Sequence, residues 1–341
     1  MGLAGALASP LRKVATSFLA PASICSIWSL AAALVLALGW LALRRRRRGR
    51  RIRAGALMRA LFARRVLLHR STRADLVYCV LSLATFGAVL GWAVVSTSWI
   101  GDGVASFLAG RFGERAPEAP TVALIAARTV VLFLAYDLGF FVDHTLKHKI
   151  PALWELHKTH HSAEALTPLV NFRVHPLDSL ILANTLSLFI GIAGGAATWL
   201  FGRRTTSFLL FDDNVLMVLY IYLTAQLQHT QIWIPFTGTW GRLFMSPAHH
   251  QLHHSSDPAH FNCNMGASLA LWDWLFGSLR LPSAQSPRLK YGASGFAHDP
   301  HGAIGLIVEP AAKALAALAR MIAPRAAGAA LGERRSTSAG P

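Results

Sequence analysis

The chain has 341 residues, of which 53% are hydrophobic and only 14% are charged, and its mean hydropathy is +0.41. This composition argues against an ordinary soluble enzyme and is typical of a protein that crosses a membrane several times. The net charge of +17 would suit a nucleic-acid-binding protein, but eight arginines lie between positions 44 and 53, directly after an apolar segment. Arginines placed there orient a membrane helix and attract anionic lipids, so we expect no nucleic-acid partner.

Five apolar segments are long enough to cross a bilayer as helices, which takes roughly 20 residues. In chain order they cover residues 18–43, 76–100, 122–142, 180–201 and 208–227. The last two are expected to form an antiparallel hairpin, although Asp212, Asp213 and Asn214 weaken the fifth. Small residues at 191 and 193–197 predict either close helix packing or room for a lipid chain. We therefore predict an all-α, multi-pass membrane protein with four to five transmembrane helices.

The arginine block also predicts the topology and the regions of the chain. With residues 44–53 in the cytoplasm, the N-terminus and an external loop at 101–120 face outward, and every histidine cluster faces the cytoplasm. Residues 1–75 are predicted to be an N-terminal membrane anchor with the arginine-rich segment. Residues 76–302 are predicted to be a membrane region with a cytoplasmic helical cap. An amphipathic helix and a disordered tail are expected at 303–341.

Twelve of the 15 histidines lie between residues 140 and 261, and their spacing is regular. His144 and His148 are four residues apart, H-x2-H-H occurs at residues 157–161 and again at 250–254 (with a further histidine before it), and His229 lies between these two motifs. Histidines three or four positions apart share one face of a helix, close enough to bind one metal ion. Because neutral imidazole is the commonest side-chain ligand of transition metals, this pattern indicates a site for more than one metal ion.

Both H-x2-H-H motifs are expected on short helices that lie beneath the membrane. Pro151 suits the first turn of a helix that carries the first motif, and Ser246 followed by Pro247 suits the start of a helix that carries the second. The three cysteines are scattered and predict neither disulfides nor an iron–sulfur site. No G-x-G-x-x-G follows a strand pattern, so we expect no nicotinamide or flavin bound by this chain.

These motifs and their flanks resemble the fatty acid hydroxylase and sterol desaturase superfamily. The resemblance covers about residues 130–280, in order: H-x3-H at 144–148, L-W-E-L-H-K-T-H-H-S-A-E at 153–164, R-V-H-P at 173–176, S-P-A-H-H-Q-L-H-H at 246–254, N-M-G at 264–266 and W-D-W-L-F-G at 272–277. The chain departs from the pattern at Thr145, where many members have Arg, and in the four residues before His144. These departures bear on the substrate and leave the histidines intact.

The resemblance implies an integral-membrane enzyme with two iron ions that uses O2 to hydroxylate a C–H bond of a lipid, with desaturation as the near alternative. Fatty acyl, sphingolipid-like and sterol or isoprenoid lipids are candidate substrates, and zinc would compete for the same histidines in a purified sample. Electrons would come from a separate ferredoxin-like or cytochrome-like donor. A membrane carrier of zinc or iron is the alternative, but transport sites normally lie at the membrane midplane, whereas these histidines lie at helix ends.

Nine histidines are assigned as metal ligands: His144, His148, His157, His160, His161, His229, His250, His253 and His254. His175 is a further candidate, for ligation, for a position beside the metals or for gating the substrate, and His249 either ligates or extends the motif. In contrast, ordinary interfacial roles are expected for His69, His298 and His301.

Three carboxylates are candidates to orient the ligands. Metal-bound histidines usually donate their second ring N–H to a carboxylate or a carbonyl. Asp137, Glu164 and Asp273 lie at positions in the sequence from which they could accept such bonds. Asp137 precedes His144 by two helical turns and is expected on the same face.

Overall fold

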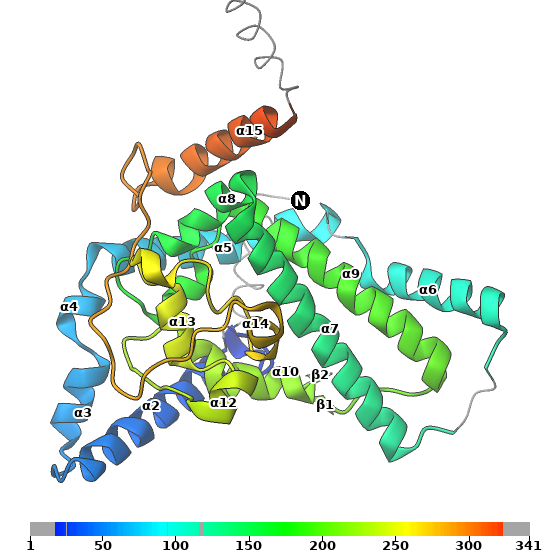
Figure 1. Ribbon diagram of the computed structural model, residues 1–341, viewed down its shortest axis with the longest axis horizontal. Helices are drawn as coiled ribbons and strands as arrows, with labels where there is room; N and C mark the ends of the chain where they lie inside the picture. The colour runs from blue at the N-terminus through cyan, green and yellow to red at the C-terminus, as the bar shows by residue number, and fades with distance from the viewer. Residues whose placement is uncertain (1–17, 25, 94, 116–118, 323–341) are drawn as a thin grey trace, which may run out of the picture.

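The computed structural model describes residues 18–24, 26–93, 95–115 and 119–322 (Figure 1). These residues are mostly helical, which confirms the predicted helical class. The only paired strands among them are the short β1 (Leu209–Leu210) and β2 (Asp213–Asn214), which form an antiparallel hairpin. The predicted disordered tail lies outside the described residues from position 323 onward.

Three helices of the described part of the chain are long and apolar enough to cross a membrane. They are α2 (Ile27–Arg47), α7 (Val122–Lys149) and α9 (Pro176–Phe201), and they correspond to the first, third and fourth predicted segments. Four arginines form the last turn of α2, where positive charge complements the helix dipole. The described residues therefore contain three candidate spans where the sequence predicted four to five.

The second predicted segment is two helices rather than one, α5 (Arg70–Ala93) and α6 (Thr97–Phe112). Ser96 begins the second of them, because its hydroxyl accepts a hydrogen bond from the backbone N–H of Trp99 at 3.3 Å. α6 continues through most of the residues predicted as an external loop, so the loop begins only at Gly113. The sequence prediction was wrong here because a run of Ser and Thr supplied a helix start inside an apolar segment.

The fifth predicted segment starts later than expected. Phe211 and Asp212 have positive φ angles of 54° and 66° in the turn between β1 and β2, and the Asn214 side chain then caps α10 (Val215–Tyr220). α10 continues through the π-helical turn η2 (Ile221–Ala225) into α11 (Gln226–Gln228). The result is a short apolar helix, so α9 has no full-length antiparallel partner in this segment.

α9 is packed between α6 and α7 (Figure 1). Two glycines of α9 allow α6 to approach closely. A Cβ atom at Gly195 would lie 2.7 Å from the Cβ of Val104, and one at Gly191 would lie 2.8 Å from the Cβ of Ile100. Of the two roles that the sequence left open for the small residues, these two positions therefore serve helix packing.

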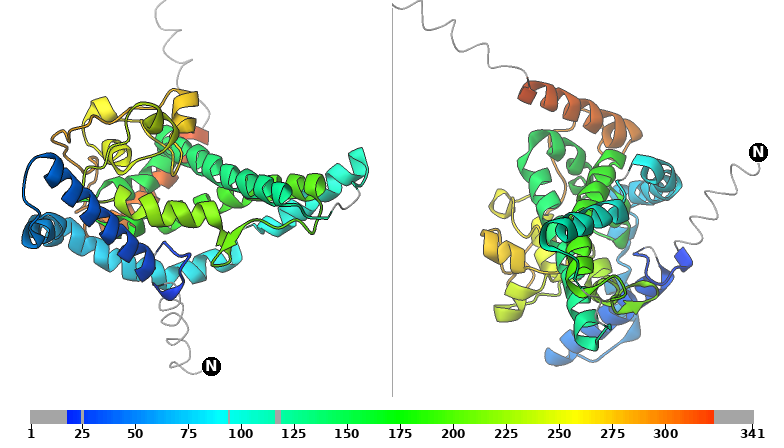
Figure 2. Two further views of the ribbon diagram at one scale, coloured as in Figure 1. Left: turned by 90° about the horizontal axis from the view of Figure 1, so that it is seen from below. Right: turned by 90° about the vertical axis from the view of Figure 1, so that its right-hand side faces the viewer.

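Short helices form a cap at one end of the α7–α9 pair (Figures 1 and 2). They are α8 (Pro151–His161), η1 (Pro168–Phe172), α12 (Gly238–Leu243), α13 (Pro247–His253), η3 (Pro258–His260) and α14 (Leu271–Phe276). α8 begins at Pro151, and α13 follows Ser246 at its N-cap, as predicted. The two helices that carry the H-x2-H-H motifs are thus short elements outside the candidate spans.

The N-terminal helix α2 packs against η2, α11 and the segment that follows them. After α2 the chain passes through α3 (Ala54–Leu61) and α4 (Arg64–Leu67), which lie along one edge of the molecule in Figure 1. Ala33 and Ala37 of α2 contact Leu227 in a small apolar cluster. The Trp40 indole N–H donates to the carbonyl of Trp233 at 2.9 Å, which adds a polar contact across the same interface.

Arg173 joins three parts of the chain from a fully buried position. Its guanidinium contacts the Asp75 carboxylate of α5 at 2.6 Å and the carbonyl of Pro300 at 2.7 Å, and it donates to the Thr159 carbonyl of α8 at 3.2 Å. The segment after Pro300 forms η4 (Ile304–Val308) and α15 (Glu309–Ile322). α15 lies against α8 in the same region, as Figure 1 shows.

Candidate metal centre

All nine histidines predicted as ligands lie together in two groups. The first group is His144, His148, His157, His161 and His253, and the second group is His160, His229, His250 and His254. Within each group the potential ligand nitrogens are all within 4.8 Å of one another. The groups adjoin, because the ring of His161 in the first stacks on that of His254 in the second with centroids 4.6 Å apart. The site is therefore one buried, two-part cluster of imidazoles.

Four segments bring these side chains together. The end of α7 supplies His144 and His148, and α8, which follows almost at once, supplies the first H-x2-H-H motif. His229 follows directly after α11, and α13 with its C-cap residue supplies the second motif. The adjacent residues His160 and His161 point into different groups, as do His253 and His254. Each H-x2-H-H motif therefore contributes to both halves of the cluster.

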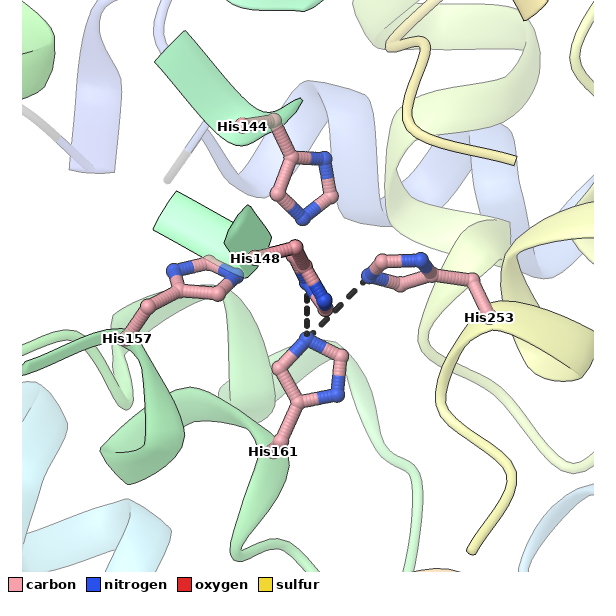
Figure 3. A group of neighbouring side chains, drawn as sticks. All are labelled: His144, His148, His157, His161 and His253. Carbon is pink, nitrogen blue, oxygen red and sulfur yellow. Dashed lines mark hydrogen bonds between the residues drawn. The ribbon is translucent and has the colours of Figure 1, made fainter. Parts of the chain in front are cut away.

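In the first group the Nε2 atoms face a common centre (Figure 3). Nε2 of His161 lies 3.2 Å from Nε2 of His148 and 3.1 Å from Nε2 of His253. Nε2 of His144 and Nε2 of His157 are buried without a hydrogen-bond partner. Such unpartnered nitrogens are costly in a buried site unless a ligand uses them.

Three rings of this group are oriented through Nδ1. His144 donates to the carbonyl of Met265 at 2.8 Å, and His253 donates to the carbonyl of Cys263 at 2.8 Å. His157 bonds Oδ2 of Asp178 at 2.9 Å. Because a carbonyl can only accept, the proton of His144 and His253 is on Nδ1, which leaves Nε2 with a lone pair directed at the centre.

The second group is tighter. Nε2 of His229 lies 3.2, 3.1 and 2.9 Å from the Nε2 atoms of His160, His254 and His250 respectively. A tetrahedral ion with metal–nitrogen distances of about 2.0–2.1 Å would separate its ligands by roughly 3.3 Å. The Nδ1 atoms of all four rings are buried without partners, so packing of the carrying segments orients them.

Burial keeps six histidines of the two groups neutral. Desolvation lowers the pKa of His160, His161, His250 and His254 well below the ordinary value of 6.5. It lowers the pKa of His229 and His253 to about 3. A neutral imidazole is the form that binds a metal. Together with the converging Nε2 atoms and the absence of thiolates from both groups, this donor set fits two transition-metal ions such as iron or zinc.

Asp178 is a residue at this site that the sequence analysis missed. It is fully buried in the first turn of α9, where it bonds His157 and forms an ion pair with Lys147. Lys147 also pairs with Asp143 at 2.6 Å, and all three charged groups are buried. An acidic residue three positions after His175, at the start of an apolar helix, was the available signal, since such residues are rarely without a function.

The three predicted carboxylates do not hold ligand rings. Asp137 is buried, but it accepts hydrogen bonds from the Ser268 N–H at 3.0 Å and the Trp272 indole N–H at 2.9 Å. Glu164 lies near the surface, 3.4 Å from His301. The correction is physical: Asp137 is two turns away from the cluster along α7, and Glu164 follows the end of α8 and turns outward.

Asp273 is connected to a ligand candidate only through the backbone. It accepts hydrogen bonds from the backbone N–H groups of Met265 and Gly266 at 2.7 and 2.8 Å. The carbonyl of Met265 in turn accepts from His144. Asp273 therefore positions the peptide that orients a ligand candidate, instead of contacting the imidazole as predicted.

Three further histidines lie outside both groups. Nδ1 of His175 accepts from the backbone N–H of Leu177 at 3.2 Å, and its Nε2 donates to the carbonyl of Ile307 at 3.0 Å, so it caps α9. His249 completes the capping box of α13 with Ser246. His301 was predicted to be an interfacial residue, but its side chain is buried and lies 2.8 Å from Arg173.

Fold and site together define a helical, membrane-type protein with an all-histidine, two-part candidate metal centre. Residues 129–278 match the family model of fatty acid hydroxylase, and this region belongs to the fatty acid hydroxylase and sterol desaturase superfamily. The matched range contains all nine histidines of the two groups. The resemblance identified from the sequence motifs is thereby confirmed.

Three curated relatives each match slightly less than half of this chain. The ornithine lipid hydroxylase OlsE of Rhizobium tropici is 28% identical over 162 residues, which is 48% of this chain and 44% of the relative. The human cholesterol 25-hydroxylase is 30% identical over 177 residues, 49% of this chain and 56% of the relative. A Delta(7)-sterol 5(6)-desaturase of Gibberella zeae is 28% identical over 167 residues, which is 46% of this chain and 43% of the relative. The chain spans about half the length of these relatives, and no solved structure matches it significantly.

Proposed function

We propose that this protein is a membrane-bound, O2-dependent hydroxylase of a lipid C–H bond with one iron ion in each histidine group. The observation that carries the proposal is the convergence of nine histidines, eight of them buried, into two adjoining sets of metal-binding geometry. The relatives named as lipid hydroxylases support the reaction type. Fatty acyl, sphingolipid-like and sterol or isoprenoid lipids are the candidate substrate classes.

The residues of this chain would hold and orient the metals. When bound, a pair of iron ions supplies the O2 activation that breaking an unactivated C–H bond demands and that no side chain can provide. Asp178 and the carbonyls of Met265 and Cys263 fix the rings of His157, His144 and His253. The burial of the cluster keeps bulk water away from the reacting C–H bond.

Desaturation of the same kind of substrate is the second candidate. It is favoured by the similarity to fungal Delta(7)-sterol 5(6)-desaturases. Either reaction consumes electrons, and we propose a separate ferredoxin-like or cytochrome-like protein as their donor. The metal-carrier alternative is not favoured, because the relatives reported above are named as hydroxylases and desaturases.

We further propose that the metal centre faces the cytoplasm. The arginines at the end of α2 support this orientation through the positive-inside rule. Under this proposal α5, which has 24 residues, is a further crossing between these arginines and residue 115. A reporter fused after residue 115, in the loop that follows α6, should then read as external. A cytoplasmic signal from that fusion would contradict the orientation and leave the chemistry untouched.

The reaction can be tested with the purified, iron-loaded protein. Reconstituted protein with a chemical reductant, O2 and a total lipid extract should consume O2 and yield a lipid heavier by one oxygen, or lighter by two hydrogens for desaturation. His253→Ala and His160→Ala, one in each group, should lose metal and product. Metal flux across the membrane without O2 consumption would overturn the proposal in favour of a carrier.

A further inference from the structure

An apolar pocket of about 430 Å³ lies between α2 and the segments beside the second histidine group. This volume is within the roughly 300–1,000 Å³ that is usual for ligand pockets. Leu30 and Leu34 of α2 line one side, and Leu166 and Leu227 line the other. His229 of the second group lies between two lining positions, 227 and 230, in the chain. The pocket is therefore placed to hold a hydrocarbon chain next to the metal centre.

Two polar atoms in this apolar lining have no partner. Oγ1 of Thr167 and Oε1 of Gln231 are buried without a hydrogen bond, and Thr167 is only 6% exposed. The amide group of Gln231 donates to the carbonyls of Ala60 and Leu61 at 2.8 and 2.9 Å, which fixes its oxygen in place. Because buried polar atoms are normally paired, these two indicate a polar group of a bound molecule.

A cationic recess adjoins the pocket. The recess shares Phe62 and Gln231 with the pocket and is lined by Arg59, Arg64 and Arg65. None of the ion pairs formed within the described residues involves these three arginines. Unpaired arginines beside an apolar pocket complement a ligand with a negative end. The walls that α2, α3 and α4 contribute to the pocket and the recess lie outside residues 129–278, which match the family model. This part of the binding site therefore belongs to the N-terminal region of the chain.

We propose that the pocket binds a single-chain lipid with an anionic head group. The hydrocarbon chain lies between α2 and Leu166, a polar group near the head bonds Thr167 and Gln231, and a carboxylate or phosphate reaches the three arginines. The inference rests on the proposed function in taking this lipid as the substrate. It narrows the candidate classes, since sterols and other uncharged lipids lack the anionic end.

Binding can be measured without turnover. Full-length, metal-loaded protein in nanodiscs of uncharged lipid would be titrated with cis-parinaric acid, followed by competition with palmitate, 1-palmitoyl lysophosphatidate, hexadecanol and cholesterol. Both anions should compete, and the tighter one identifies the head group as carboxylate or phosphate. Hexadecanol, with the same chain but no charge, should bind about tenfold more weakly. Equal affinity for hexadecanol or cholesterol and for both anions would overturn the proposal.

Paired variants locate the site. Leu34→Trp fills the pocket and should weaken binding of the tighter anion about tenfold. Val35→Trp on the same helix is the control, because Val35 is 68% exposed and does not line the pocket. Equal effects of the two substitutions, or no effect of either, would contradict the assigned pocket. Thr167→Val keeps the shape of the side chain and should also weaken binding.

The recess is tested in the same way. The double variant Arg64→Glu, Arg65→Glu should reduce anion affinity to that of hexadecanol, whereas Arg73→Glu, an exposed arginine outside the recess, should leave it unchanged. Metal content should equal that of the wild-type protein in every variant. Anion binding with no O2-dependent product would refute the proposed function but not the pocket. Turnover with no response of binding to the pocket variants would refute the pocket alone.

Discussion

The ring of His157 is held by a carboxylate, whereas those of His144 and His253 are held by backbone carbonyls. A carbonyl cannot be removed by substitution, but Asp178 can. The imidazole of His157 is therefore the point at which the electrostatics of the first group can be changed without touching a ligand candidate.

We expect Asp178→Asn to weaken metal binding in the first group by about 10- to 100-fold, because a partner of a ligating histidine raises its basicity and fixes its orientation. The second group should keep its ion, so elemental analysis should give about one metal per chain after mild chelation. Glu164→Gln is the control, since Glu164 contacts no member of either group in the described structure. Retention of both metals in Asp178→Asn would show that His157 needs no such partner.

The buried charges beside this site make a prediction about stability. Lys147→Met would leave Asp143 and Asp178 facing each other without their cation, and breaking such a buried pair costs about 3–5 kcal/mol. The unfolding temperature in detergent should fall, and adding Asp143→Asn should restore part of it. Lys149→Met, at an exposed position two residues away, should have little effect. Equal unfolding temperatures for the two single variants would contradict the buried network.

The sequence predicted the nine histidines of the two groups but not the residues that orient them. The spacing of His157, His160 and His161 indicates that they are ligand candidates, because helical periodicity places them on one side of α8. Asp178 has no such local signature relating it to His157, since the contact exists only where α8 and the start of α9 converge. The Met265 carbonyl is a backbone group and carries no signal in the sequence at all.

At the scale of elements, the contact between α6 and α9 gives two neighbouring glycines of α9 different surroundings. A Cβ atom at Gly195 would lie 2.7 Å from that of Val104, whereas one at Gly194 would meet only Leu132, at 3.8 Å. Gly195→Ala should therefore destabilise the fold by about 1–3 kcal/mol through overpacking. Gly194→Ala gains the same helix propensity without a clash and should be neutral or stabilising. Thermal unfolding of both variants checks this, and a stabilised Gly195→Ala would contradict the close packing.

Helix starts were predictable where a local motif determines them. Pro151 and the pair Ser246–Pro247 begin α8 and α13 because capping and the fixed φ of proline act within one turn. The break before α6 and the late start of α10 were not predicted, although Ser96 and Asn214 are good N-caps. In both cases a long apolar run outweighed the cap in the sequence analysis, while in the structure the cap decides where the helix begins.

At the scale of the whole molecule, the buried imidazoles make the stability of the metal-free protein depend on pH. His229 and His253 have a pKa of about 3 in the fold, against 6.5 in an unfolded chain. Between these values the unfolded chain binds more protons, so the free energy of unfolding falls as the pH is lowered from about 6.5. The unfolding temperature of the chelated protein should fall steadily on acidification to about pH 5, and that of the metal-loaded protein should fall less. An unfolding temperature of the chelated protein that does not change over this range would contradict the buried, neutral state.

The distribution of the ligand candidates along the chain has a consequence for biosynthesis. His144 and His254 are 110 positions apart, and each group draws on segments from α8 to α13. A ribosome adding about 5–20 residues per second needs roughly 5–20 seconds to complete that stretch. During this interval the early histidines of α7 and α8 are exposed to whatever ions the cell supplies, with neither group closed. If the proposed metals bind, the supply of ions and the timing of synthesis would help to decide which metal the finished protein carries.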